Sequence, residues 1–205
     1  IFKTMSAINF KMWRHALTTI PRIEKEEWVK LDVVSKWLIS TRASVFIMTA
    51  ISSIIGGIMA LNHGTFIVSN FIAAFLGLIF AHASNNLVND LTDSAKGIDK
   101  DNYFRAQYGP QPIEHGLLSK KTIYNYLAVS LTIAILCGAY LIWQTGITTF
   151  YFFLIGLFFL LFYTWPLKFI GLGELTVIAV WGPLLVGGTY FVTTGGLWSC
   201  PVMIL

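Results

Sequence analysis

Three stretches of the chain contain no Asp, Glu, Lys or Arg: residues 43–89, 122–167 and 175–205. The first two are each about twice as long as the roughly 20 apolar residues that one membrane-spanning helix needs, and the third has room for one helix and the start of another. Hydrophobic residues make up 56% of the chain and charged residues 12%, far from the balance of soluble domains. The sequence therefore predicts an all-α, polytopic transmembrane helical bundle and excludes a water-soluble globule.

A short polar turn signal lies near the middle of each of the two long stretches. These signals are Asn62-His63-Gly64 and Gln144-Thr145-Gly146. Such tripeptides mark turns, so each long stretch is predicted to form a helical hairpin. The five expected spans cover residues 43–61, 65–88, 122–143, 147–165 and 174–193, and the segment from Leu197 reads as the beginning of a sixth.

The positions of the basic residues predict the orientation. If the amino terminus is cytoplasmic, all 14 Lys and Arg residues fall on the cytoplasmic side, because neither hairpin tip nor the 194–200 turn carries one. This distribution obeys the positive-inside rule. We therefore expect an integral, multi-pass membrane protein in which the amino terminus and the loops near residues 89–121 are cytoplasmic.

The first 42 residues are polar and basic, and we predict that they form a cytoplasmic or interfacial segment ahead of a membrane domain covering 43–205. Within 24–42, four apolar residues recur at helical spacing among charges: Trp28, Leu31, Val34 and Leu38. One interpretation is a helix lying on the cytoplasmic surface of the bilayer with its tryptophans at headgroup depth. The other is a solvated lead-in that only sets the orientation.

Oxygen-bearing side chains gather at the end of the second predicted span. If this helix continues to about residue 95, Asn86, Asn89, Asp90 and Asp93 lie on one helical face at the membrane boundary. Carboxylates three residues apart destabilise a helix unless a cation or strong hydrogen bonding offsets their repulsion. Mg²⁺ takes hard oxygen ligands and commonly joins one or two carboxylates to substrate phosphates. The pattern therefore predicts a Mg²⁺ site formed by these four residues.

Several basic side chains follow this cluster. Carboxylates alone do not bind a diphosphate, so a metal must lie between the two, and nearby cations can neutralise the remaining charge. The candidates are Lys96, Arg105, Lys120 and Lys121. A simpler interpretation is that a loop between membrane helices carries charged residues because it is exposed to water. The acids, however, begin while the apolar helix is still running, and ionisable groups at such positions are functional candidates.

A second patch runs from Tyr163 through Pro166 and Lys168 to Gly171-Leu172-Gly173-Glu174. Its residues predict a helix stopped by the proline, a tight glycine turn and a carboxylate that opens the next span. By itself, the acid could simply be favoured by the helix dipole.

At the oxygen-rich cluster the sequence resembles the UbiA-type family of intramembrane aromatic prenyltransferases, whose first aspartate-rich motif closes the second membrane helix. The run from Asp93 through Lys96-Gly97 to Asp99 is similar to that of the naphthoate branch, the menaquinone-forming polyprenyltransferases and their relatives. The Gly-Leu-Gly-Glu turn also recurs in that branch, where it faces the cytoplasmic side of the cavity. The resemblance implies catalytic roles for Asp90, Asp93 and Asp99, a diphosphate-binding role for Lys168, and an aromatic-substrate side formed by Tyr163 and Glu174.

The implied reaction is the transfer of a polyprenyl group from an allylic diphosphate to an aromatic acceptor such as dihydroxynaphthoate, in quinone biosynthesis, with Mg²⁺ as cofactor and no nucleic-acid partner. The family has nine spans and a second aspartate-rich motif after the sixth. This chain resembles the first five to six spans and has no second motif. The resemblance therefore implies a piece that catalyses little or no transfer alone.

Two alternatives remain open. Within the family, the acceptor could be a hydroxybenzoate, a haem, a chlorophyllide or a glycerol-phosphate lipid. From a different class, the chain could be a cation- or proton-coupled membrane transporter, with His82 on a proton path. Transport acids should lie near mid-membrane, whereas these acids cluster at one face, and a lone histidine in a span is more often a hydrogen-bonded packing residue.

Overall fold

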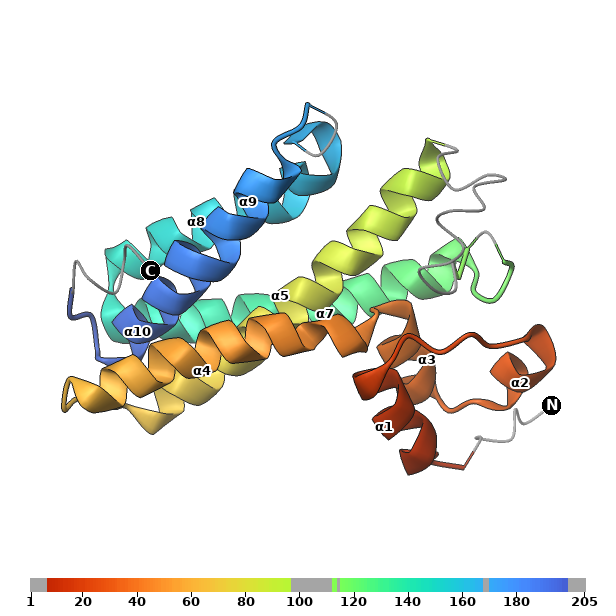
Figure 1. The fold of residues 1–205 in the computed structure, drawn as a ribbon, viewed down its shortest axis with the longest axis horizontal. Coiled ribbons are helices and arrows are strands. Elements are labelled where there is room, and N and C mark those ends of the chain that lie inside the picture. Colours follow the sequence, from red (N-terminus) through yellow and green to blue (C-terminus); the bar gives the residue numbers. More distant parts are fainter. Residues whose placement is uncertain (1–6, 97–111, 114, 168–169, 199–205) are drawn as a thin grey trace. The chain divides into compact units, whose positions relative to one another are not determined.

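The computed structural model describes residues 7–96, 112–113, 115–167 and 170–198. All the regular structure in these ranges is helical (Figure 1), which confirms the predicted all-α fold class. The chain divides into two compact units. The first contains residues 1–46 and 86–128, and the second contains 47–85 and 129–205.

Four helical segments within these described ranges are long and apolar enough to cross a membrane. They are Ala43–Asn62, Val68–Ala95, Lys120–Thr145 and Gly173–Thr193. The segment predicted to span at 147–165 is α-helical only in α8 (Ile147–Phe162), after which the five-residue π-helical turn η2 (Tyr163–Leu167) follows. Pro166 explains this early change, because it has no N–H to donate to the preceding turn. The predicted span at 147–165 is therefore helical throughout, although its α-helical part alone is shorter than the four long segments.

Both predicted hairpin turns are confirmed. Helix α4 (Phe46–Asn62) ends at the first turn and α5 (Val68–Ala95) begins after it. Gly64 has a φ of 85° in this turn, and Gly146 has a φ of 81° between α7 (Lys120–Thr145) and α8. Glycine reaches positive φ at little cost, so these residues allow the sharp reversals.

The second unit is held together by small residues that admit close helix contacts. Helices α9 (Gly173–Ala179) and α10 (Gly188–Thr193) are joined by the π-helical segment η3 (Val180–Gly187), which contains Pro183. A Cβ atom at Gly56 of α4 would lie 2.5 Å from the Val186 carbonyl oxygen. Tyr190 is almost fully buried in the same cluster, with Ala60. Glycine at position 56 thus sets how closely α4 approaches the 173–193 segment.

Three short helices lead the first unit: α1 (Phe10–Thr18), α2 (Lys25–Lys30) and α3 (Val33–Ser40). The remainder of this unit includes the last turns of α5 and the first turns of α7. The 3₁₀ turn η1 (Ala43–Val45) follows α3 and leads into α4.

The expectation of one surface helix over 24–42 is wrong. Leu31 and Asp32 are extended, and the Asp32 carboxylate accepts a hydrogen bond from the Ser35 N–H, which starts α3 as a new helix. Trp28 and Leu38 are buried, whereas Val34 is exposed. The break at Asp32 removes the single continuous face on which the interpretation depended.

Asp32 also joins α1 to α3. Its carboxylate accepts hydrogen bonds from the Asn9 N–H at 3.2 Å, from the Trp13 indole N–H at 3.1 Å, and from the Ser35 hydroxyl. Burial alone would raise the pKa of the Asp32 carboxyl, but the hydrogen bonds from Ser35, Trp13 and Asn9 outweigh it and hold this pKa below its ordinary value.

Candidate functional site

Helix α5 continues beyond its apolar part to Ala95, which meets the condition on which the shared face depended, and carries the oxygen-rich cluster on its last three turns. All four cluster side chains are buried: Asn86 and Asn89 are each 9% exposed, Asp90 is 3% exposed and Asp93 is fully buried. Buried carboxylates are rare unless they are paired with a charge or bind a metal. Their burial distinguishes these side chains from the solvent-exposed charged residues of a loop.

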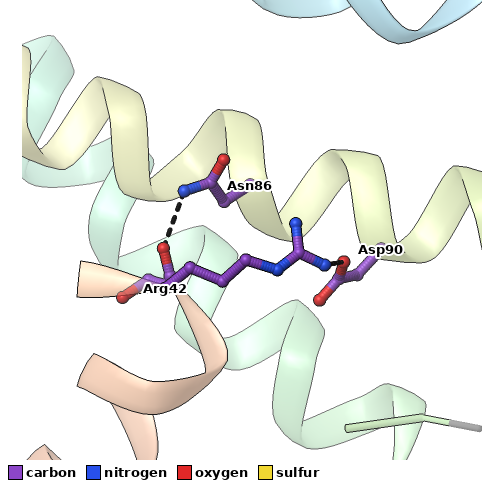
Figure 2. Close-up of polar contacts among 4 residues, drawn as sticks. Arg42, Asn86 and Asp90 are labelled. Carbon is purple, nitrogen blue, oxygen red and sulfur yellow. Dashed lines mark hydrogen bonds and ion pairs between the residues drawn. The ribbon is translucent and has the colours of Figure 1, made fainter. Parts of the chain in front are cut away.

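Two of these side chains reach the Thr41–Arg42 turn between α3 and η1 (Figure 2). The Asn86 amide donates to the Thr41 carbonyl oxygen at 2.7 Å, and the Arg42 guanidinium forms an ion pair with the Asp90 carboxylate. Asn86 and Asp90 are one helical turn apart, so they lie one above the other on the same face. The two contacts therefore fix this turn against α5 at two points.

The backbone of Arg42 is left-handed, with φ 52° and ψ 53°. It is the single non-glycine residue with positive φ in the part of the chain that the structure describes. For a residue with a Cβ this conformation costs about 1–2 kcal/mol. Such strain is often concentrated at functional sites, where surrounding contacts hold it in place.

Arg42 was not among the predicted site residues. The sequence signal was its position as the last charge before the first uncharged stretch. Spacing could not reveal its partner, because Asp90 lies 48 residues further along the chain.

The donors of this cluster suit a hard cation. The described residues contain no group of three or more His, Cys, Asp or Glu side chains that could hold a metal ion. Two carboxylates and two amides offer only oxygen donors of the kind that Mg²⁺ prefers. Because Mg²⁺ is usually held by one or two carboxylates together with substrate phosphates, this set fits a Mg²⁺–diphosphate complex better than a cage made only of protein.

The predicted diphosphate-binding lysines lie in the same unit. Lys96 directly follows α5, and Lys120 and Lys121 open α7; all three are exposed. Cations at a helix N-terminus are unfavourable for the helix dipole, but together with the N-terminal N–H groups they favour an anion. The predicted residues Asp99 and Arg105 lie outside the described residues.

The second sequence patch belongs to the other unit. Gly171 has a φ of 81°, which confirms the predicted glycine turn. Tyr163 is half-buried at the beginning of η2, and Glu174 is exposed in the first turn of α9. Lys168 lies outside the described residues.

His82 takes part in a small polar cluster among the membrane helices. The Thr49 hydroxyl lies 2.8 Å from His82 Nδ1 and accepts a hydrogen bond from the Trp181 indole at 3.3 Å. The rings of His82 and Trp181 also meet edge to face, with centroids 5.9 Å apart. These contacts are those of a hydrogen-bonded packing residue, so His82 gives no support to the transporter alternative.

A model of the UbiA prenyltransferase family matches residues 50–205, a range that includes both sequence patches. The chain belongs to the UbiA prenyltransferase family. Comparisons with curated proteins and with solved structures found no match. The four long apolar helices of the chain and its membership of the UbiA family identify it as an integral membrane protein of the prenyltransferase class.

Proposed function

We propose that this UbiA protein transfers a polyprenyl group from an allylic diphosphate to dihydroxynaphthoate, in the formation of a quinone. The observation that carries the proposal is the buried row of oxygen donors on α5, which contacts the Thr41–Arg42 turn. A prenyl transfer from an allylic diphosphate releases a multiply charged diphosphate anion beside the membrane, and this cluster has the donors for the cation that such an anion requires.

We assign the Mg²⁺ ligands to Asn86, Asn89, Asp90 and Asp93. The chemistry that bound Mg²⁺ supplies is Lewis-acid stabilisation of the negative charge on the departing diphosphate. The protein's own contribution is positional: the last three turns of α5 keep the donors at fixed spacing, and the burial of their side chains shields them from water.

The cations complete the diphosphate site in this proposal. Lys96, Lys120 and Lys121 lie in the same unit as the carboxylates and can neutralise phosphate oxygens, with Arg105 and Lys168 as further candidates from outside the described residues. Arg42 joins them because its planar guanidinium already contacts Asp90 and matches the geometry of a phosphate. Asp99 stays a proposed catalytic residue on the resemblance alone.

The choice of acceptor rests on the Asp-x-x-Lys-Gly-x-Asp run that ends at Asp99 and on the Gly-Leu-Gly-Glu turn. We assign Tyr163 and Glu174 to the aromatic-substrate side. A phenol and a carboxylate can hydrogen-bond the hydroxyl groups of a dihydroxylated ring.

The test is a transfer assay on membranes that contain the protein expressed from its complete coding sequence. Labelled farnesyl or geranylgeranyl diphosphate is supplied with Mg²⁺ and, separately, with dihydroxynaphthoate, hydroxybenzoate, haem, chlorophyllide and a glycerol-phosphate lipid. The proposal predicts a labelled product with dihydroxynaphthoate and none with excess chelator. Product with another acceptor alone would refute the naphthoate assignment, and absence of product with every acceptor would refute the transfer activity.

A further inference from the structure

One side of helix α1 is exposed and carries both apolar and basic side chains. Ala16 is buried and Trp13 is hydrogen-bonded to Asp32, so these two residues mark the inner side. The outer side carries Phe10 and Leu17, which are 69% and 51% exposed and seven residues apart, with the exposed Arg14 between them. Two large apolar side chains therefore flank a cation on one helical stripe.

The charge on α1 has one sign. Lys11 and Arg14 are exposed, and the helix contains no acidic residue. Exposed basic residues combined with exposed apolar residues on one short helix are typical of helices that lie in the headgroup layer of an anionic bilayer. An acidic protein surface would match the charge but would not account for Phe10 and Leu17 as well.

The chain also places α1 close to the membrane. Asp32 ties α1 to the start of α3, and α3 ends three residues before the membrane-spanning segment Ala43–Asn62. The eight residues of α3 rise only about 12 Å along the helix axis. Because α1 is bonded to the start of α3, it is held within reach of the headgroup region. With the predicted orientation, this is the cytoplasmic leaflet, which carries anionic lipids.

We propose that the outer face of α1 binds anionic lipid headgroups: Lys11 and Arg14 contact lipid phosphates, and Phe10 and Leu17 insert into the interface. This binding is independent of the prenyl-transfer chemistry. It replaces the surface that the sequence suggested, because Trp28 and Leu38 point into the unit rather than toward lipid.

The test measures how well water-soluble and lipid-soluble agents reach α1. A nitroxide is attached to Thr18→Cys in a Cys137→Ala, Cys200→Ala background, and the protein is placed in nanodiscs of phosphatidylcholine or of phosphatidylcholine with phosphatidylglycerol. A neutral nickel complex reports contact with water, and oxygen reports contact with lipid. A second label at Glu27→Cys, on the exposed side of α2, is the control site.

We expect the nickel complex to reach position 18 about three-fold less in the anionic discs than in the neutral ones, while position 27 stays unchanged. Lys11→Gln with Arg14→Gln should abolish this difference, whereas the matched charge change Lys25→Gln with Lys30→Gln on α2 should preserve it. Phe10→Ala with Leu17→Ala should lower contact with oxygen.

Equal accessibility in the two lipids would overturn the proposal. An equal effect of the α2 charge variant would overturn it too, since the response would then follow net charge rather than this helix face. Low accessibility of position 18 to both the nickel complex and oxygen would show that another part of the protein covers α1, which also contradicts lipid binding.

Discussion

Arg42 and Asp90 form an ion pair that joins the chain just before the first membrane helix to the last turns of the second. The pair is partly buried, with the Arg42 side chain 21% exposed and the Asp90 side chain 5% exposed. One helical turn away, Asn86 holds the neighbouring carbonyl of Thr41. The proposed metal-binding face of α5 is thus in contact with a strained arginine that can also bind phosphate.

This pair predicts a measurable coupling in stability. Arg42→Gln should lower the free energy of unfolding in detergent by about 1–3 kcal/mol, because it leaves the Asp90 charge in a site of low exposure. Adding Asp90→Asn should recover part of the loss. Thermal unfolding of the two single variants and the double variant gives the coupling energy directly.

Lys25→Gln, which removes an exposed cation from helix α2 of the same unit, serves as the charge control and should change stability little. Strictly additive effects of Arg42→Gln and Asp90→Asn would show that the two side chains do not stabilise each other.

The close contact at Gly56 predicts a second, purely steric effect. Gly56→Ala places a methyl group 2.5 Å from a backbone oxygen of Val186, so α4 must move, at a cost of about 1–3 kcal/mol. Gly188→Ala is the matched control, since its methyl group meets nothing within 4 Å and replacing a helical glycine adds up to about 1 kcal/mol. Melting temperatures of the two variants should move in opposite directions. A neutral Gly56→Ala would contradict the described packing.

Asp32 predicts an acid-sensitive first unit. Its pKa is lower in the folded state than in the unfolded state, so its hydrogen bonds stabilise the fold fully above the unfolded value near 3.8 and are lost as pH falls through the lower folded value. Between pH 6 and pH 3 the wild-type melting temperature should therefore fall more than that of Asp32→Asn. The variant should be less stable at pH 6 and differ less from wild type at pH 3. Parallel curves would mean that Asp32 does not titrate with folding.

The sequence predicted the spans well where hydrophobicity and turn residues act locally. The uncharged stretches and the turns at Gly64 and Gly146 were enough to place the hairpins. The continuation of α5 to Ala95 was only assumed in placing the four oxygen-bearing residues on one face, and the structure supplies it. The naphthoate acceptor, the roles of the site residues, the division of the chain at residue 42 and the membrane orientation stay predictions.

The failures have two physical causes. Periodicity over 24–42 suggested one helix, but a single capping carboxylate at Asp32 restarted the helix and turned Trp28 inward. Arg42 was missed because a contact between residues 48 positions apart leaves no local pattern. Local chemistry therefore indicated which residues could form a site, whereas tertiary contacts decided which cation lies against Asp90.

A change in the substrate-binding lysines should act through affinity. Lys120→Gln with Lys121→Gln should raise the KM for the prenyl diphosphate several-fold with a smaller effect on kcat, because these exposed cations attract the ground-state anion as well as the transition state. Lys25→Gln with Lys30→Gln removes the same charge from α2 and should leave KM unchanged. Steady-state kinetics over a range of diphosphate concentrations separates the two effects, and a loss confined to kcat would contradict the assignment.

The central claim is that the buried donors on α5 hold Mg²⁺ and a prenyl diphosphate together. Equilibrium binding of labelled geranylgeranyl diphosphate to the purified protein in nanodiscs, over a series of Mg²⁺ concentrations, tests it most directly. We predict binding that depends on Mg²⁺, at least about ten-fold weaker binding for Asp93→Asn, and unchanged binding for the exposed control Glu27→Gln. Wild-type affinity that is the same with Mg²⁺ and with excess chelator, or an Asp93→Asn protein that binds as tightly as wild type, would contradict the account.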